Sequence, residues 1–79
     1  MYTITPATCR AARGLLRWSQ AELATRAHVG VVTVRQFENG HATPRTLTIR
    51  ALEGALEEAG VEFTNGDKPG VRLARETKH

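Results

Sequence analysis

The sequence has little cysteine, few aromatic residues and no long apolar run. One cysteine, Cys9, among 79 residues allows no internal disulfide and no thiolate metal cluster, and the three histidines lack metal-ligand spacing. No apolar run approaches the roughly 20 residues of a membrane span, and the first residues lack the basic and apolar regions of a signal peptide. We therefore expect a cytoplasmic protein with no metal, no cofactor and no membrane partner.

Catalytic groups are also missing in any recognisable arrangement. No Ser-His-Asp set is apparent, and small apolar neighbours around Cys9 predict a buried, inert thiol rather than a nucleophile. We therefore do not expect an enzyme. The length fits one small domain, and a hydrophobic fraction of 41% is enough for a modest core.

Lysine is absent from the first 50 residues, where every basic side chain other than histidine is an arginine. This part carries seven arginines and two glutamates, a balance of +5, whereas residues 51–79 carry four basic and six acidic residues, a balance of −2. The planar guanidinium suits bidentate contacts with phosphate and with base edges. The charge split is consistent with an anionic partner and, equally, with an ordinary solvated surface.

Local signals predict helices over residues 6–16, 20–27, 31–38 and 46–59. Thr5-Pro6 is a typical helix start. Ser19 and Glu22 have the spacing of a reciprocal capping box, with Trp18 before it as a hydrophobic staple and core wedge. The third helix is expected to stop at Asn39-Gly40 and the fourth at Gly60. The second and third helices, of about eight residues each with a link of about three, have the spacing of a helix-turn-helix.

The tail has a different period. Residues 61–63 and 71–73 alternate between apolar and other residues, and a segment rich in turn residues separates them. We expect a short β-hairpin. Because two strands alone are marginally stable in water, they must pack on the helices or pair with a second chain.

Residues 18–40, WSQAELATRAHVGVVTVRQFENG, resemble the helix-turn-helix of the lambda-repressor-like family, the phage repressor and Cro type. The residues that carry the resemblance are Ser19, Gln20, Glu22, Leu23, Ala24, Val29, Val34, Phe37, Glu38 and Gly40. The similarity extends over about residues 5–60. It implies a mainly α fold: a four-to-five-helix DNA-binding domain in residues 1–60, followed by a C-terminal β-hairpin or strand pair in residues 61–79.

Two positions depart from the family pattern. His28 stands where the turn usually has glycine, and histidine tolerates a left-handed backbone better than most residues. Gly30 stands where the third helix usually has a serine N-cap, and glycine caps slightly less well. Both departures predict a turn that is a little less rigid than usual.

The third helix is expected to read bases in the major groove. On a helical wheel Val34 and Phe37 face the core, whereas five residues on the other side or at its flank become the expected base contacts: Val31, Val32, Thr33, Arg35 and Gln36. Valine methyls suit the thymine methyl group, arginine can bind guanine O6 and N7, and glutamine can bind adenine N6 and N7.

The resemblance also implies contacts that position the protein on the DNA backbone. The expected phosphate or minor-groove residues are Gln20, Asn39, Gly40, His41 and Arg45. The family further has a partly buried ion pair between its first and third helices, which would join Arg13 and Glu38 here. A pairing role explains a glutamate at the end of a helix that faces DNA.

The resulting function is a sequence-specific transcriptional regulator, a repressor or a dual regulator, that binds double-stranded DNA as a dimer on two half-sites. The tail is the expected dimerisation element, through Val61, Phe63, Val71 and Leu73. Strand pairing and hydrophobic docking are both open for this contact. The alternative is an antitoxin or antiactivator-type module of the same fold, which binds a protein partner through the C-terminal tail.

Overall fold

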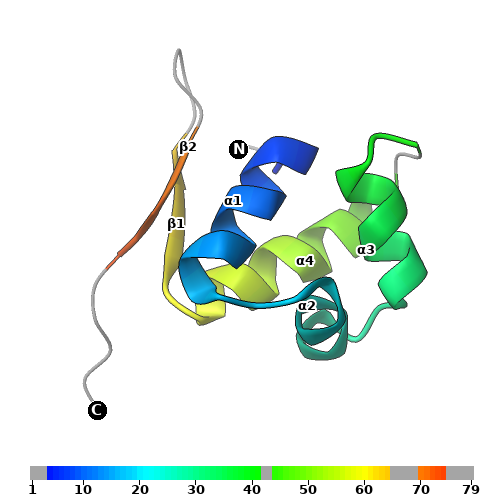
Figure 1. The fold of residues 1–79 in the computed structure, drawn as a ribbon, viewed down its shortest axis with the longest axis horizontal. Coiled ribbons are helices and arrows are strands. Elements are labelled where there is room, and N and C mark those ends of the chain that lie inside the picture. The colour runs from blue at the N-terminus through cyan, green and yellow to red at the C-terminus, as the bar shows by residue number, and fades with distance from the viewer. Residues whose placement is uncertain (1–3, 42–43, 65–69, 75–79) are drawn as a thin grey trace.

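Helices come first along the chain and a two-stranded sheet follows them (Figure 1). The structure, a computed structural model, describes residues 4–41, 44–64 and 70–74. In these residues the elements are the helices α1 (Pro6–Leu16), α2 (Gln20–Ala27), α3 (Val31–Glu38) and α4 (Thr46–Glu58), and the strands β1 (Val61–Thr64) and β2 (Gly70–Leu73). The mainly α architecture is the one predicted, and α4 ends one residue earlier than expected.

Side-chain caps fix the starts of α1 and α2. In α1 the capping box is complete: Thr5 Oγ1 accepts the Thr8 N–H at 3.1 Å, and Thr8 Oγ1 accepts the Thr5 N–H at 2.9 Å. In α2, Ser19 Oγ accepts the Glu22 N–H at 3.0 Å. The Glu22 carboxylate pairs with Arg26 at 2.8 Å, one turn along the helix. The predicted reciprocal hydrogen bond, from the Ser19 N–H to the Glu22 carboxylate, is therefore wrong. The carboxylate pairs with a charged partner, Arg26, instead.

Left-handed residues end several helices. His28 closes α2 with φ 60°, so histidine adopts the conformation expected of it at this turn. Arg17 closes α1 with φ 61°, which the sequence pattern did not indicate. After α3, Asn39 stays right-handed with φ −86° and Gly40 takes the positive φ of 77°. Glycine adopts such angles without the steric cost that a side chain brings.

The hydrophobic core lies where the four helices meet. Leu23, Val34, Leu52 and Leu56 are fully buried, and Phe37 is nearly so. Trp18 is half-buried and packs against this core, with the Arg26 guanidinium 4.8 Å from its ring centroid. Val34 and Phe37 therefore point inward, as predicted, and Val31, Val32, Arg35 and Gln36 are left exposed on the other side of α3.

The sheet lays one apolar face on the helices. β1 and β2 are antiparallel, with Val61 opposite Leu73 and Phe63 opposite Val71, and residues directly opposite share a face of the sheet. Val61 is 2% exposed and belongs to the core, whereas Phe63 and Val71 are half-buried against it. Val61 was expected to bind a second subunit. Its side chain packs inside its own chain instead, which leaves it little surface for a second subunit.

In the described part of this tail, residues 61–64 and 70–74, little apolar surface is left free. Leu73, 46% exposed at the margin of the sheet, is the most accessible of the four residues expected to dimerise. The other face is polar and carries the Arg72–Glu62 ion pair at 2.7 Å. Residues 65–69 and 75–79 of the expected tail lie outside the described residues.

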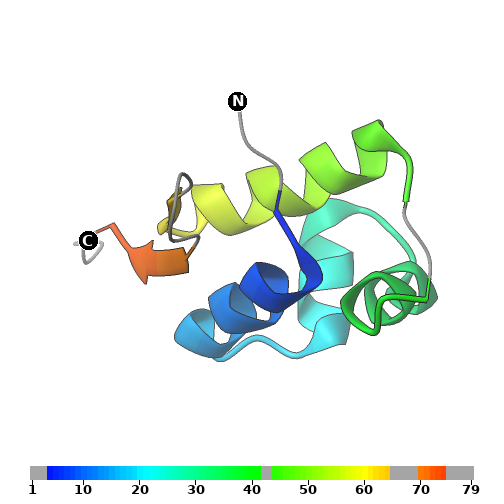
Figure 2. The same ribbon diagram turned by 90° about the horizontal axis from the view of Figure 1, so that it is seen from above.

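The sheet and α3 lie at opposite ends of the molecule. This separation is visible in two perpendicular views (Figure 1 and Figure 2). A partner at one end therefore does not cover the other. None of the helices is long and apolar enough to cross a membrane, within the part of the chain that the structure describes.

Candidate nucleic-acid interface

The outward face of α3 combines apolar and polar side chains. Val31 and Val32, in its first turn, are 36% and 51% exposed. Arg35 and Gln36 are exposed one turn later, and Thr33 is half-buried at the flank. Exposed valines are unusual on an inert helix surface, since valine is among the residues most often buried. All five residues expected to read bases are therefore accessible or partly accessible on one short helix.

The turn between α2 and α3 sets how this face is presented. The Val29 N–H donates to the Ala24 carbonyl at 3.0 Å across the left-handed His28, and the half-buried Val29 side chain packs on the core. Gly30 begins α3 without a side-chain cap. The first turn of α3, with Val31 and Val32, thus has free N–H groups at an exposed end. Such a helix start favours a nearby anion.

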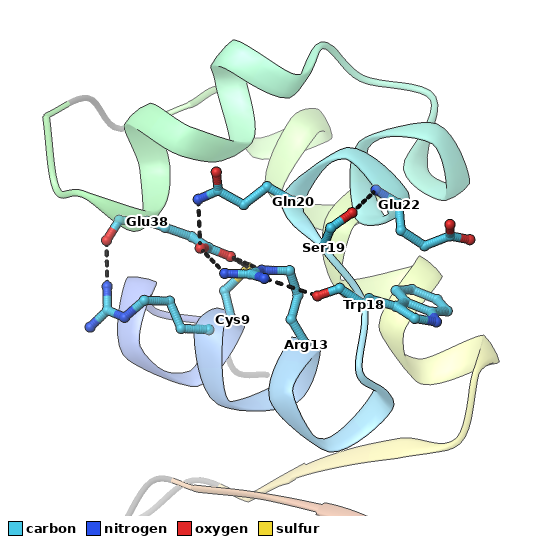
Figure 3. A network of polar contacts seen from close by, with 8 residues as sticks. Cys9, Arg13, Trp18, Ser19, Gln20, Glu22 and Glu38 are labelled. Atoms are coloured by element: carbon cyan, nitrogen blue, oxygen red, sulfur yellow. Dashed lines mark hydrogen bonds and ion pairs between the residues drawn. The ribbon is translucent and has the colours of Figure 1, made fainter.

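A buried carboxylate ties this helix to the rest of the fold (Figure 3). Glu38, the last residue of α3, is 1% exposed. Arg13 of α1 binds it through two parallel hydrogen bonds, from Nε to Oε2 at 2.8 Å and from Nη2 to Oε1 at 2.7 Å. Gln20 Nε2 donates to Oε1 at 3.0 Å and Cys9 Sγ donates to Oε2 at 3.1 Å. The ion pair implied by the family resemblance is present, with two further donors.

The same network reaches the backbone. Arg13 Nη1 donates to the Trp18 carbonyl at 2.9 Å, which anchors the link between α1 and α2. Arg10 Nη1 donates to the Glu38 carbonyl at the end of α3. Carbonyls at a helix end lack partners within the helix, so Arg10 satisfies one of them. Sequence reasoning left Arg10 unassigned; the signal was its place one turn before Arg13 on the same helix.

Electrostatics in this cluster keep the carboxylate ionised and the thiol neutral. Burial alone would raise the pKa of Glu38, but the hydrogen bonds from Arg13, Gln20 and Cys9 outweigh it and lower that pKa. Burial, together with the hydrogen bond to Glu38, raises the pKa of the Cys9 thiol far above its ordinary value. Cys9 is thus a buried donor, not a nucleophile, in line with the inert thiol expected.

The residues expected to touch phosphate occupy two places. Asn39, Gly40 and His41 are exposed directly after α3, and Arg45 is exposed at the N-cap of α4. Gln20 differs from this group because its amide is half-buried and donates to Glu38. Gln20 therefore has an internal role that sequence reasoning missed.

No metal-binding cluster of three or more His, Cys, Asp or Glu side chains is present among the residues described.

No curated protein matches the chain. A protein-family model described as Helix-turn-helix matches residues 10–63, which is more than half of the chain. That segment contains α2, α3 and α4 and the Arg13–Glu38 pair. The chain therefore belongs to the lambda-repressor-like, Cro/C1-type helix-turn-helix family and carries a DNA-binding domain.

Proposed function

We propose that this protein is a sequence-specific transcriptional regulator that places α3 in the major groove of double-stranded DNA. The observation that carries the proposal is the exposed face of α3, where Val31 and Val32 stand beside Arg35 and Gln36 on a helix whose other side is buried. A major groove admits one such helix. The Glu38 network holds α3 against α1 and α2, so the reading face is rigidly oriented.

Base readout and backbone positioning fall to different residues. Arg35 reads guanine and Gln36 reads adenine, while the valine methyls contact thymine methyl groups and Thr33 contacts a phosphate or a base edge. Phosphate and minor-groove contacts come from the exposed residues around the end of α3 and the start of α4, together with the N-terminus of α2: Gln20, Asn39, Gly40, His41 and Arg45. Backbone contacts of this kind fix register without reading sequence.

A dimer completes the proposal. One unit of this size reads only a few base pairs, and two units on half-sites about one helical turn apart would supply an operator-length site. Repression, or dual regulation, follows from occupying such a site near a promoter.

Selection of bound sequences from random DNA tests this function, followed by titration of the selected site at several salt concentrations. Arg35→Ala should relax preference at one base pair, by about 1–3 kcal/mol. Arg45→Ala should weaken binding to all sequences and reduce the salt slope by about 1. Arg72→Ala is the matched control, since this arginine lies on the sheet at the far end from α3, and it should change neither quantity. If the selection from random DNA enriched no sequence, the proposed function would be contradicted.

A protein-binding role is the second candidate, of the antitoxin or antiactivator type. It is supported by Leu73, which is 46% exposed on a strand that pairs on one side only, at the end of the molecule opposite α3. Exposed strand edges are ready templates for another chain. Co-purification with the product of the neighbouring gene tests it, and loss of that complex on Leu73→Asp is the expected result.

A further inference from the structure

Helix α4 carries a glycine that nothing described in this chain requires. Gly54 lies in the middle of the helix, on the side opposite the inward-facing Leu52 and Leu56, and it is exposed. A Cβ atom added there would meet no heavy atom within 4 Å. Glycine inside a helix destabilises it relative to alanine. A residue that weakens its own helix and leaves open space is what a close approach by another backbone needs.

The charges around Gly54 are symmetric and opposite. Arg50 lies four residues before it and Glu58 four residues after it, which places them about 6 Å on either side along the helix axis. All three residues are exposed, and positions four apart lie on one helical face. Reversing the direction of the helix about Gly54 therefore places a negative charge where the positive one was.

The surface around this face is hollowed, and it combines small and charged side chains. Ala51 and Ala55 of α4 and Ala27 of α2 line a shallow groove with Gly54, and charged or polar side chains complete its lining: Arg26, His28, Arg50, Glu57 and Glu58. Leu47, seven residues before Gly54 and so on the same face, is 79% exposed, the highest exposure among the large apolar side chains described. This face of α4 therefore leaves a large apolar side chain uncovered near its N-terminal end.

We propose that α4 packs antiparallel against α4 of a second copy of this chain, about a twofold axis at Gly54. Arg50 of each copy then faces Glu58 of the partner subunit, so one contact occurs twice, as a twofold interface requires. The missing side chain at Gly54 lets the two backbones approach. The match is self-complementary, because Arg50 and Glu58 lie at equal distances on either side of Gly54.

This dimer rests on the proposed function and supplies the second half-site that it needs. The groove is lined by residues of α2 and α4, and none of the α3 residues proposed to read bases belongs to it. The proposed α4 contact also replaces the tail as the dimerisation element, because Val61 is buried and Phe63 and Val71 pack on the core.

Charge reversal tests the contact. Sedimentation of the full chain without DNA, over a series of concentrations, should show a monomer–dimer equilibrium for the natural sequence. Arg50→Glu alone and Glu58→Arg alone should each weaken dimerisation at least tenfold, since each places like charges together twice. An equimolar mixture of the two variants should dimerise again, because both contacts are then between opposite charges. Circular dichroism confirms that each variant is folded.

Three results would overturn the proposal: a natural sequence that stays monomeric, single variants that dimerise like it, or a mixture that stays monomeric. Loss of the dimer on Leu73→Asp alone, with the two charge variants unaffected, would place the interface on β2 instead.

Gly54→Ala separates the contact from helix stability. The added methyl group should raise the melting temperature of the monomeric Arg50→Glu variant, yet weaken dimerisation of the otherwise natural sequence several-fold. An unchanged dimerisation constant would contradict a close approach at Gly54. Binding to a single half-site, measured with the monomeric variants, distinguishes the two proposals. Retained half-site binding with no dimer in any protein rejects the interface and leaves base readout by α3 intact. A dimer that does not bind DNA rejects the proposed function and leaves the interface intact.

Discussion

At the scale of single residues, Glu38 explains how a short recognition helix is held in place. It is an acid at the C-terminal end of α3, where the helix dipole disfavours a negative charge. Arg13 offsets this cost through its two hydrogen bonds to the carboxylate, and Arg10 binds the carbonyl of the same residue. Glu38 thereby joins α1 and α2 to the end of α3, and its charge stays away from the face proposed for DNA.

Removing this carboxylate should be costly. Glu38→Ala leaves Arg13, 18% exposed, without its partner, and breaking a buried ion pair costs about 3–5 kcal/mol. For a domain of this size each kcal/mol lowers the melting temperature by roughly 4–8 °C, so thermal melting is a sufficient measurement. Glu22→Ala is the matched control, because its pair with Arg26 is largely exposed and such pairs contribute roughly 0.5 kcal/mol. Equal melting shifts for the two variants would contradict the role given to Glu38.

Acid should act through the same group. The pKa of Glu38 is lowered in the folded protein from an ordinary value of 4.5. Its contribution to stability is therefore present above about pH 5 and is lost as pH falls through the lowered pKa. Urea unfolding at a series of pH values should show stability falling below pH 4.5, with a smaller fall in Glu38→Gln, which has no charge to lose. Parallel pH profiles would assign the acid sensitivity to other carboxylates.

At the scale of elements, local signals predicted most helix boundaries and long-range contacts supplied the rest. Caps such as Ser19 and stops such as Gly40 act through hydrogen bonds within four residues, so the sequence alone contains them. The helical wheel likewise placed Val34 and Phe37 inward. What it could not supply were contacts between distant parts of the chain, such as those that make Val61 a core residue.

Two helix ends are strained in a way that a substitution can relieve. Arg17 and His28 hold φ values of 61° and 60° at the ends of α1 and α2. A left-handed conformation costs an L-residue about 1–2 kcal/mol, partly offset because glycine has more freedom in the unfolded chain. Arg17→Gly and His28→Gly should each raise the free energy of unfolding by about 0.5–1 kcal/mol in urea titrations.

Asn39 provides the control for these substitutions. It also caps a helix, but its φ is −86°. Asn39→Gly should therefore bring no gain in stability, because no strain is relieved there. If all three glycine variants stabilised the protein alike, the effect would not come from the left-handed backbone.

At the scale of the whole molecule, the fold separates its surfaces. α3 and the sheet lie at opposite ends, and α4 extends between the helical core and the sheet, with β1 packed against it. The arginine-rich first half of the sequence divides accordingly. Arg35 and Arg45 are exposed beside the face proposed for DNA. The half-buried Arg13 binds the Glu38 carboxylate, and the exposed Arg10 donates to the Glu38 carbonyl. Only part of the +5 balance in residues 1–50 is therefore available to attract phosphate.

The sheet packs as part of the helical core, and a substitution at Val61 tests this. Its burial at 2% in a core shared with Leu52 and Leu56 means that Val61→Ala leaves a cavity among the helices, at a cost of about 2 kcal/mol. The whole domain should then melt in one transition, lowered by roughly 8–16 °C. Leu73→Ala, on the facing strand but 46% exposed, should shift the same transition much less. If Val61→Ala left the helical signal unchanged and melted the sheet alone, the strands would not be part of the helical core. That result would favour the prediction that the tail binds a second subunit.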